Sequence, residues 1–308
     1  MADKFIIGID LGGTNLKVAL LDKGYRIKDK DILNTRRFSA RNALISAIAD
    51  SVVNLIKANN LGKTDILGIG IGLPGPVDRE KGVVHFFPNI PGWREVGLKG
   101  ILERRLKIPV AVDNDAKLMC IAEHALGAAK GFNNAVCVTL GTGVGGGIII
   151  NGALYRGSSN ASGEIGHIPI NEKGPRCNCG GYACLEDYIG NNVILKKAKK
   201  AFGRDIQLEE LSSLAKRGNL KARAIWLEVA ASLSVALVVV VNLLNPDCIV
   251  IGGGVAGAGK ILFDSVRKKI LSRAMSVQAR HVKVYKAKLG NRAGLIGAAI
   301  LAGQRIRR

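Results

Sequence analysis

Aromatic and acidic residues are both scarce in this chain. Phe, Trp and Tyr make up 5% of the 308 residues, which is little for a protein that stacks the bases of single-stranded nucleic acid. Lys and Arg outnumber Asp and Glu by 45 to 24, a net charge of +21. Such a charge attracts nucleic acid, anionic lipid or phosphorylated small molecules, but the basic residues are scattered, which favours a solvated basic surface. We therefore expect no specific nucleic-acid partner.

Long hydrophobic segments and a disulfide framework are also missing. The N-terminal sequence MADKFIIGID has no extended apolar segment and no cleavage signal. The most apolar stretch, 225–244, is interrupted by Glu228, Ser232, Ser234 and Asn242, so we expect a buried helix there and no membrane span. Six cysteines are too few for a disulfide framework. These absences predict a soluble, cytoplasmic protein without a membrane partner.

Hydrophobic residues and glycine are abundant. Hydrophobic residues make up 48% of the chain, which excludes intrinsic disorder, and the length suggests about two domains. The 39 glycines are clustered rather than periodic, which excludes collagen. Two clusters, 11–15 and 141–147, each lie between two expected strands. The repetition indicates a weak internal duplication of α/β units.

A third glycine run, 252–254, follows an expected strand. Glycine lets backbone N–H groups approach an anion, so three such loops suggest a bound nucleotide, although a single loop is equally explained by a tight turn. The dinucleotide spacing at 141–146 opens a strand where a helix is needed. The same dinucleotide spacing occurs at 252–257, but no acidic ribose ligand follows the next strand. A P-loop in this region also fails to match, because Ile261 stands where a P-loop has Ser or Thr.

Two further patterns carry chemistry. Cys177, Cys179 and Cys184, with His167 upstream, supply three thiolates and an imidazole, which suit a structural tetrahedral zinc site; three reduced thiols in a loop are the alternative. Asp115 stands at the expected start of a helix. Phosphoryl transfer to an alcohol needs a carboxylate beside the hydroxyl, and a helix N-cap is the alternative, compatible role.

The order of motifs resembles the ROK family of bacterial sugar kinases and sugar-responsive repressors, most closely its glucokinase-type members. The motifs are Asp10-Leu-Gly-Gly-Thr-Asn15, Leu73-Pro-Gly-Pro-Val-Asp78, Asn89-Ile-Pro-Gly-Trp93, Asp113-Asn-Asp115, Leu140-Gly-Thr-Gly-Val-Gly145, Gly163-Glu-Ile-Gly-His167, the Cys177–Glu186 segment and Ile251-Gly-Gly-Gly-Val255. The resemblance implies an α/β, actin-like ATPase (ribonuclease H-like) fold, with two duplicated domains around a central cleft. We expect a first domain of 1–115 plus about 292–308, and a second of 116–291 with a zinc-binding loop at about 160–190.

The resemblance also implies site residues. For ATP and its Mg²⁺ it implies Asp10, Gly12, Gly13, Thr14, Asn15, Lys17, Gly141, Thr142 and Gly143, with Gly252, Gly253 and Gly254 at the adenosine. For the sugar it implies Gly75, Asn89, Asn114, Asp115, Glu164, His167 and Glu186. For structural Zn²⁺ it implies His167, Cys177, Cys179 and Cys184, and Asp115 is the implied general base.

The resemblance thus predicts ATP-dependent phosphorylation of a hexose, with glucose converted to glucose 6-phosphate. An N-acetylmannosamine or other N-acetylhexosamine kinase is the alternative. A sugar-responsive regulator carries a DNA-binding domain before the first glycine motif, which here begins at residue 10. A homodimer or homotetramer is expected. The chain departs from the family pattern in three places. Lys117 stands where Asn is frequent, Ser159-Asn160 stands before Ala161 where a Gly is usual, and Ala183 stands where Gly is frequent before the third cysteine.

Overall fold

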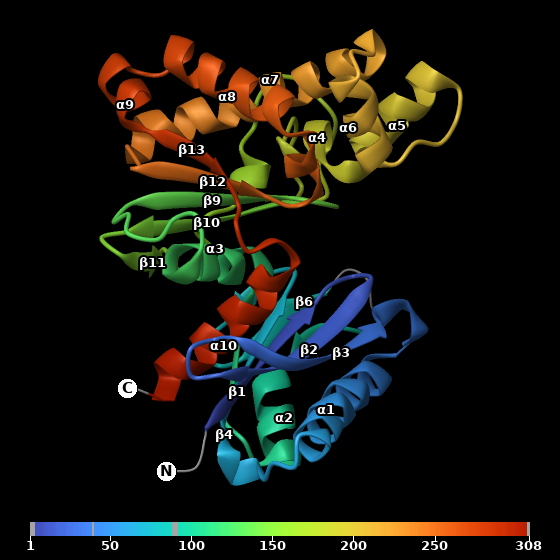
Figure 1. Ribbon diagram of the computed structural model, residues 1–308, viewed down its shortest axis with the longest axis vertical. Helices are drawn as coiled ribbons and strands as arrows, with labels where there is room; N and C mark the ends of the chain where they lie inside the picture. The colour runs from blue at the N-terminus through green and yellow to red at the C-terminus, as the bar shows by residue number, and fades with distance from the viewer. Residues whose placement is uncertain (1–3, 39, 88–91, 307–308) are drawn as a thin grey trace. The chain divides into compact units, whose positions relative to one another are not determined.

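The structure of the chain is a computed structural model that describes residues 4–38, 40–87 and 92–306. The described residues form two compact α/β units, shown in Figure 1. Unit 1 comprises the described parts of 1–122, 156–161 and 291–308. Unit 2 comprises 123–155 and 162–290.

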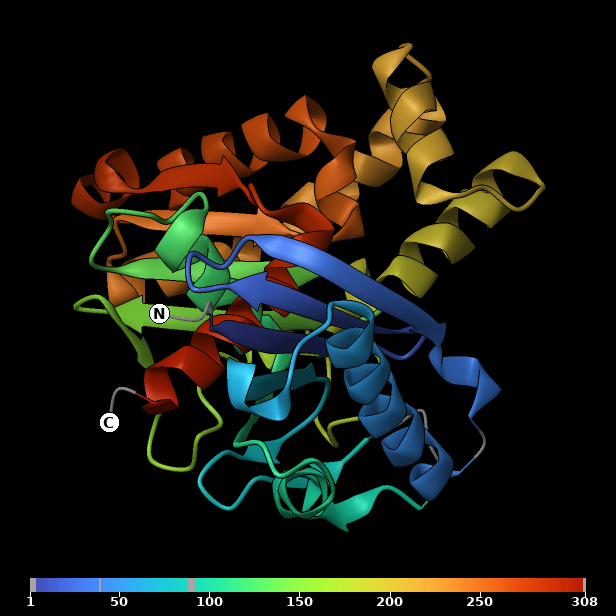
Figure 2. The ribbon, with the colours of Figure 1, turned by 60° about the horizontal axis from the view of Figure 1, so that its bottom comes forward.

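Unit 1 contains a five-stranded sheet of order β3-β2-β1-β4-β8. The three N-terminal strands pair antiparallel, and β4 and β8 then extend the sheet in parallel. Figure 2 shows β1, β2 and β3 side by side, in blue. β4 is almost wholly buried because parallel strands are covered on both faces, whereas β3, at the edge, alternates exposed and half-buried residues. The strands are β1 (Phe5–Leu11), β2 (Asn15–Asp22), β3 (Ile27–Asn34), β4 (Ile66–Leu73) and β8 (Val110–Asn114).

Unit 2 repeats this topology. Its sheet has the order β11-β10-β9-β12-β13, again with an antiparallel hairpin followed by two parallel strands. The predicted internal duplication is therefore confirmed at the level of sheet topology. The strands are β9 (Ala135–Leu140), β10 (Val144–Ile150), β11 (Ala153–Tyr155), β12 (Cys248–Gly252) and β13 (Lys283–Lys286).

Helices cover the sheets with apolar stripes. In α1 the buried residues Leu44, Ile48, Val52 and Leu55 recur at the spacing of one helix face. A second, small sheet of unit 1 joins β5 (Val77–Asp78), β6 (Val83–Phe86) and β7 (Arg94–Val96). The helices that lie wholly in unit 1 are α1 (Arg41–Ala58), α2 (Leu98–Leu106) and α10 (Ala293–Ile306), and α3 (Asp115–Leu126) begins there. Short 3₁₀ turns are η1 (Thr35–Arg37) and η2 (Lys63–Asp65).

In unit 2, α7 and α8 run side by side over the second sheet (Figure 1). The other helices of the unit are shorter. The elements are α4 (Glu186–Ile189), α5 (Asn191–Phe202), α6 (Leu208–Lys216), α7 (Leu220–Leu244), α8 (Lys260–Arg273) and α9 (Ser276–His281), with 3₁₀ turns η3 (Ile165–His167) and η4 (Gly254–Ala258). A further turn, η5 (Gly290–Arg292), precedes α10.

The apolar stretch expected to form a buried helix lies in α7. An 18-residue window of this helix has a mean hydropathy of 2.3, so by length and composition it is apolar enough to cross a membrane, contrary to the expectation that its polar residues would prevent this. In the structure, 56% of that window is buried, and residues such as Trp226, Leu233 and Leu237 belong to the core of unit 2. The predicted helix is confirmed, and its apolar character is largely explained by this burial.

Helix α10 approaches the first sheet at backbone distance. A Cβ atom on Gly70 of β4 would lie 1.7 Å from the Ala298 carbonyl oxygen of α10. A Cβ on Gly8 of β1 would lie 2.2 Å from the Leu295 carbonyl oxygen. These positions require glycine because another backbone occupies the space of a side chain.

We expect Gly70→Ala to destabilise the protein by about 3 kcal/mol, because helix and strand must move apart to admit the methyl group. The matched variant is Gly100→Ala within α2, where the new Cβ would meet only the end of the Arg104 side chain. That substitution should be neutral or stabilising by up to about 1 kcal/mol, since alanine favours a helix. Thermal unfolding measures both, and equal melting temperatures for the two variants would contradict the packing argument.

Candidate active site and metal centre

The first glycine hairpin joins β1 to β2. The Gly12 N–H donates to the Asn15 carbonyl at 2.9 Å and closes the turn. Thr35, fully buried in η1, braces it from outside: its N–H donates to the Thr14 carbonyl at 2.9 Å, and its hydroxyl donates to the Gly12 carbonyl at 3.0 Å. Sequence reasoning missed Thr35, because its partners lie more than twenty residues earlier in the chain.

Asp10 and Lys17 face each other across this hairpin. They are register partners, and the Lys17 Nζ lies 3.0 Å from Asp10 Oδ2, with both side chains mostly buried. A Cβ on Gly294, in the first turn of α10, would lie within 3 Å of the Asp10 carboxylate atoms. Asp10 therefore lies at the N-terminus of α10, where the helix dipole stabilises a carboxylate. The predicted phosphate loop thus carries a fixed carboxylate and a fixed ammonium.

The second hairpin joins β9 to β10 and is held by Glu186. The Gly141 N–H donates to the Gly143 carbonyl at 2.9 Å. Glu186, the first residue of α4, accepts a 2.7 Å hydrogen bond from the Val144 N–H through Oε2. A Cβ on Gly143 would lie 2.3 Å from this oxygen, so a side chain there would displace the Glu186 carboxylate. Glu186, predicted as a sugar contact, is thereby placed against the predicted phosphate turn.

The third glycine loop adjoins the second hairpin. Gly253 follows β12 with a φ of 85°, and a Cβ on it would lie 2.1 Å from the Leu140 carbonyl oxygen at the end of β9. The Asn191 N–H at the start of α5 donates to the Gly141 carbonyl at 2.9 Å. Unit 2 therefore gathers two predicted nucleotide loops at the carboxyl ends of β9 and β12, which is where α/β sheets bind ligands.

Asn191 was missed by sequence reasoning. Its side-chain Nδ2 would lie 3.9 Å from a Cβ on Gly254, so it borders the predicted adenosine loop. Its Oδ1 is buried and has no hydrogen-bond partner among the described residues. No motif marks Asn191 in the sequence, because its place beside Gly254 arises only from the packing of α5.

Asn114 and Asp115 lie where β8 meets α3. Asn114 Oδ1 accepts from the backbone N–H groups of Ala116 at 3.0 Å and Lys117 at 3.2 Å, so Asn114 caps the helix. Its Nδ2 donates to the Gly75 carbonyl at 3.2 Å. Asp115 is the first residue of α3, and its Oδ1 accepts from the Ala116 N–H at 2.7 Å. The alternative role of Asp115 as the N-cap is therefore wrong, since Asn114 fills it.

The predicted sugar contacts are divided between the units. Unit 1 brings together Gly75, Asn114 and Asp115. Unit 2 places Glu164 beside η3, which contains His167 and packs on β10. Asn89 lies outside the described residues.

The four predicted zinc ligands converge. One ligand atom from each of His167, Cys177, Cys179 and Cys184 lies within 4.8 Å of all the others. His167 Nδ1 is 3.7 Å from Cys177 Sγ, and Cys179 Sγ is 3.7 Å from Cys184 Sγ. A zinc tetrahedron with bonds of about 2.3 Å to sulfur has edges of about 3.8 Å, so the donor set and its spacing fit zinc. Because Nδ1 lies on the thiol side, Nε2 remains on the other side of the imidazole ring.

The thiols of this cluster differ in acidity. Burial raises the pKa of Cys177 to about 12, and burial also raises the pKa of Cys184. The Gly181 N–H donates to the exposed Cys179 and lowers the pKa of that thiol. A bound cation favours the thiolates of both buried cysteines, so metal binding at this cluster releases protons.

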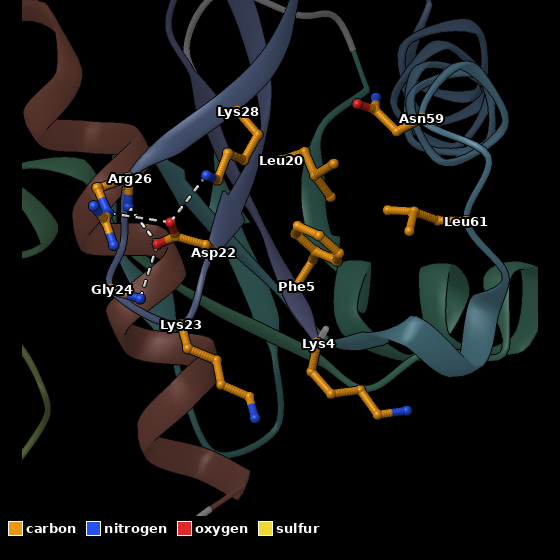
Figure 3. A pocket seen from close by; sticks show the side chains of 10 residues that line it. All are labelled: Lys4, Phe5, Leu20, Asp22, Lys23, Gly24, Arg26, Lys28, Asn59 and Leu61. Atoms are coloured by element: carbon orange, nitrogen blue, oxygen red, sulfur yellow. Dashed lines mark hydrogen bonds and ion pairs between the residues drawn. The ribbon is translucent and has the colours of Figure 1, made fainter. Parts of the chain in front are cut away.

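Two hollows lie apart from all predicted site residues. One, of about 510 Å³, lies at the far end of the β1–β2 hairpin and is shown in Figure 3. There the Asp22 carboxylate pairs with Arg26 at 3.2 Å and Lys28 at 3.4 Å, and the Arg26 N–H lowers the pKa of Asp22. The other, of about 1000 Å³, lies beside α8 and is lined by Lys216, Arg223 and further basic residues.

Comparison with known proteins places this geometry in a family. The profile described as "ROK family" matches residues 6–305. The chain belongs to the ROK family. It is 36% identical to the "Glucokinase" of Halalkalibacterium halodurans, over 99% of this chain and 96% of that protein. Its fold is the actin-like ATPase fold of ROK kinases.

Two other relatives show the range of the family. A ROK family glucokinase from Streptomyces griseus, solved in complex with glucose and AMPPNP, is 32% identical, with a TM-score of 0.85 over 97% of this chain and 99% of that one. The xylose repressor of Caldicellulosiruptor bescii is 29% identical over 95% of this chain and 76% of the repressor. The family thus joins kinases and regulators on one fold.

We expect the purified protein to contain one zinc ion per chain, measured by elemental analysis. Cys177→Ser should lose the zinc and lower the melting temperature by several degrees, because the metal fixes a loop with little regular structure. Cys120→Ala, at a buried cysteine of α3 outside the cluster, should keep the zinc. Equal zinc contents in both variants, or none in the unaltered protein, would refute the assignment.

Proposed function

We propose that this chain transfers the γ-phosphoryl group of ATP to the 6-hydroxyl of a hexose, with glucose as the preferred acceptor and glucose 6-phosphate as the product. The assignment of the chain as a sugar kinase rests on the relatives named glucokinase. The proposed chemistry rests on the position of Asp115, which begins α3 directly after the Asn114 cap.

Asp115 is the proposed general base. Asn114 supplies the helix cap, and the Asp115 carboxylate accepts the Ala116 N–H through Oδ1, which holds the carboxylate at the start of α3. A carboxylate in this position accepts the proton of the attacking hydroxyl as the phosphorus–oxygen bond forms. Attachment of Asn114 to the Gly75 carbonyl keeps the end of β8 in place during this step.

The two glycine hairpins are the proposed phosphate binders. The glycines of their turns lack side chains that would shield the backbone N–H groups from an anion. Lys17 adds a cation at the first hairpin, and Gly252–Gly254 with Asn191 border the proposed adenosine site in unit 2.

Asp10 fits a role in magnesium binding. Mg²⁺ in kinases is held by one or two carboxylates, water and substrate phosphates, and Asp10 is a single fixed carboxylate beside the proposed phosphate turn. When bound, the ion neutralises charge on the phosphates.

The zinc loop orients the sugar side of the proposed site. His167 offers Nδ1 to the thiol cluster, so its Nε2 is the nitrogen that can meet a sugar hydroxyl. Glu164 immediately precedes the η3 turn that carries His167. We include Asn89 among the proposed sugar ligands on the resemblance alone.

The acceptor is tested with a coupled assay of ADP release, using Mg-ATP and glucose, N-acetylmannosamine, N-acetylglucosamine, fructose, mannose and allose. We expect the highest kcat/KM with glucose. Turnover confined to an N-acetylated sugar would replace glucose by an N-acetylhexosamine at the same site. If zinc-loaded protein releases no ADP with any of these sugars, the kinase proposal is overturned.

Asp115→Asn should lower kcat by about 10²- to 10⁴-fold, because the amide cannot accept the hydroxyl proton. Sugar binding, followed by titration calorimetry, should change little. Asp50→Asn is the control, since this exposed carboxylate of α1 forms a surface ion pair with Arg105, away from the proposed site residues. Near-normal turnover of Asp115→Asn would exclude the residue as the base.

A further inference from the structure

The loop 156–161 belongs to a different unit from the residues that precede and follow it. The residues on both sides of it, up to Tyr155 and from Ser162, group with unit 2, but the loop itself groups with unit 1. The Ser162 hydroxyl donates to the Tyr155 carbonyl at 2.6 Å, so a hydrogen bond closes the neck of the loop. Such a loop has no sheet or helix of its own to hold it, and its position depends on contacts made by its residues.

Two buried ionic groups of unit 1 hold the loop. At its start, Arg156 Nη2 lies 2.7 Å from Oδ2 of Asp113, a residue only 2% exposed. At its end, the ammonium of Lys117 donates to the Asn160 carbonyl. Lys117 is only 4% exposed, although lysine is almost never buried to this degree. Burial of an ammonium is costly, so its hydrogen bond to the Asn160 carbonyl offsets part of that cost.

Asn160 has the backbone shape that this contact needs. Its φ of 59° lies in the left-handed region, which asparagine tolerates better than most residues. The chain turns there, and the carbonyl that results is the one bound by Lys117.

The two anchors flank the proposed base in sequence. Asp113 precedes and Lys117 follows the pair Asn114–Asp115, at the junction of β8 and α3. The loop is therefore fastened on both sides of the residues proposed to meet the sugar. Three residues beyond Ala161 the chain reaches Glu164, another proposed sugar ligand.

We infer that Lys117 is a positioning residue for the sugar: its buried ammonium fixes the 156–161 loop beside Asn114 and Asp115 and so sets the affinity for the hexose. The inference rests on the proposed function, since it names a further determinant of the same site. Lys117 takes no part in proton transfer. The tether lies at the junction of β8 and α3, beside the residues proposed to meet the sugar, so we expect its effect on the hexose and not on ATP.

The test compares Lys117→Met with Lys30→Met, which removes an exposed lysine from β3 of the same unit. Methionine keeps the length and apolar stem of Lys117 but cannot donate to the Asn160 carbonyl. We expect the KM for the hexose to rise about 10-fold or more, as for the loss of a hydrogen bond from a charged donor, with the KM for ATP changed less than 2-fold. Lys30→Met should match the unaltered protein in both constants.

A second readout does not depend on activity. Brief trypsin digestion, followed by mass spectrometry of the fragments, reports cleavage of the bond after Arg156. This bond should be cut about 10-fold faster in Lys117→Met, because the released loop can enter the protease, while Lys30→Met is cut at the original rate.

The outcomes separate the two proposals. If the unaltered protein phosphorylates no hexose, the proposed function fails, and trypsin still decides whether Lys117 holds the loop. If the unaltered protein is active but Lys117→Met keeps its hexose KM, or raises both KM values equally, the inference about Lys117 is overturned. Unchanged cleavage after Arg156 also overturns it.

Discussion

Backbone contact between α10 and its neighbours is the constraint on which unit 1 depends. Gly8 of β1 and Gly70 of β4 have no room for a side chain beside the α10 carbonyls, and Gly297 of α10 has none beside the Leu118 carbonyl of α3. The C-terminal helix is thus seated on two central strands and on the helix that begins with Asp115. Since the N-terminus of α10 also meets the Asp10 carboxylate, one packing arrangement supports both the proposed phosphate turn and the proposed base.

Unit 1 also buries three charged side chains near the start of α3. Asp113, Lys117 and Arg156 are buried or nearly so, which is costly unless every charge has a partner. Asp113 pairs with Arg156 of the 156–161 loop, and Lys117 donates to the Asn160 carbonyl of the same loop, so the loop helps to offset the cost of burial. In unit 2, the loop-rich segment after β11 brings three thiols and an imidazole together, and its Ile165 and Leu185 belong to the hydrophobic core of the unit.

Much of this arrangement was predictable because its signals are local. Glycine turns between apolar strands predicted both hairpins, and the spacing of Cys177, Cys179 and Cys184 with His167 predicted that these four side chains come together. The charged strand β3 was not predicted, because an edge strand needs no apolar face and its alternation of Lys and Asp resembles a loop.

Residues whose roles depend on distant contacts were beyond sequence reasoning. Asn114 rather than Asp115 caps α3, a choice that depends on backbone geometry at the end of β8. Thr35 and Asn191 reach the glycine turns from other elements, and Lys117 meets Asn160 across 43 positions of sequence. Sequence comparison with the family marked Lys117 and Asn160 as separate departures, and only the structure joins them.

The central claim is that this fold moves a phosphoryl group from ATP to a hexose hydroxyl. Phosphorus NMR of a reaction with ATP and glucose tests it most directly, because the signal identifies the bond that forms. The account predicts loss of the γ-phosphate signal and growth of one phosphate monoester signal, coupled to the two protons on carbon 6 of the sugar. Release of inorganic phosphate without an ester, or an ester at another carbon, would contradict it.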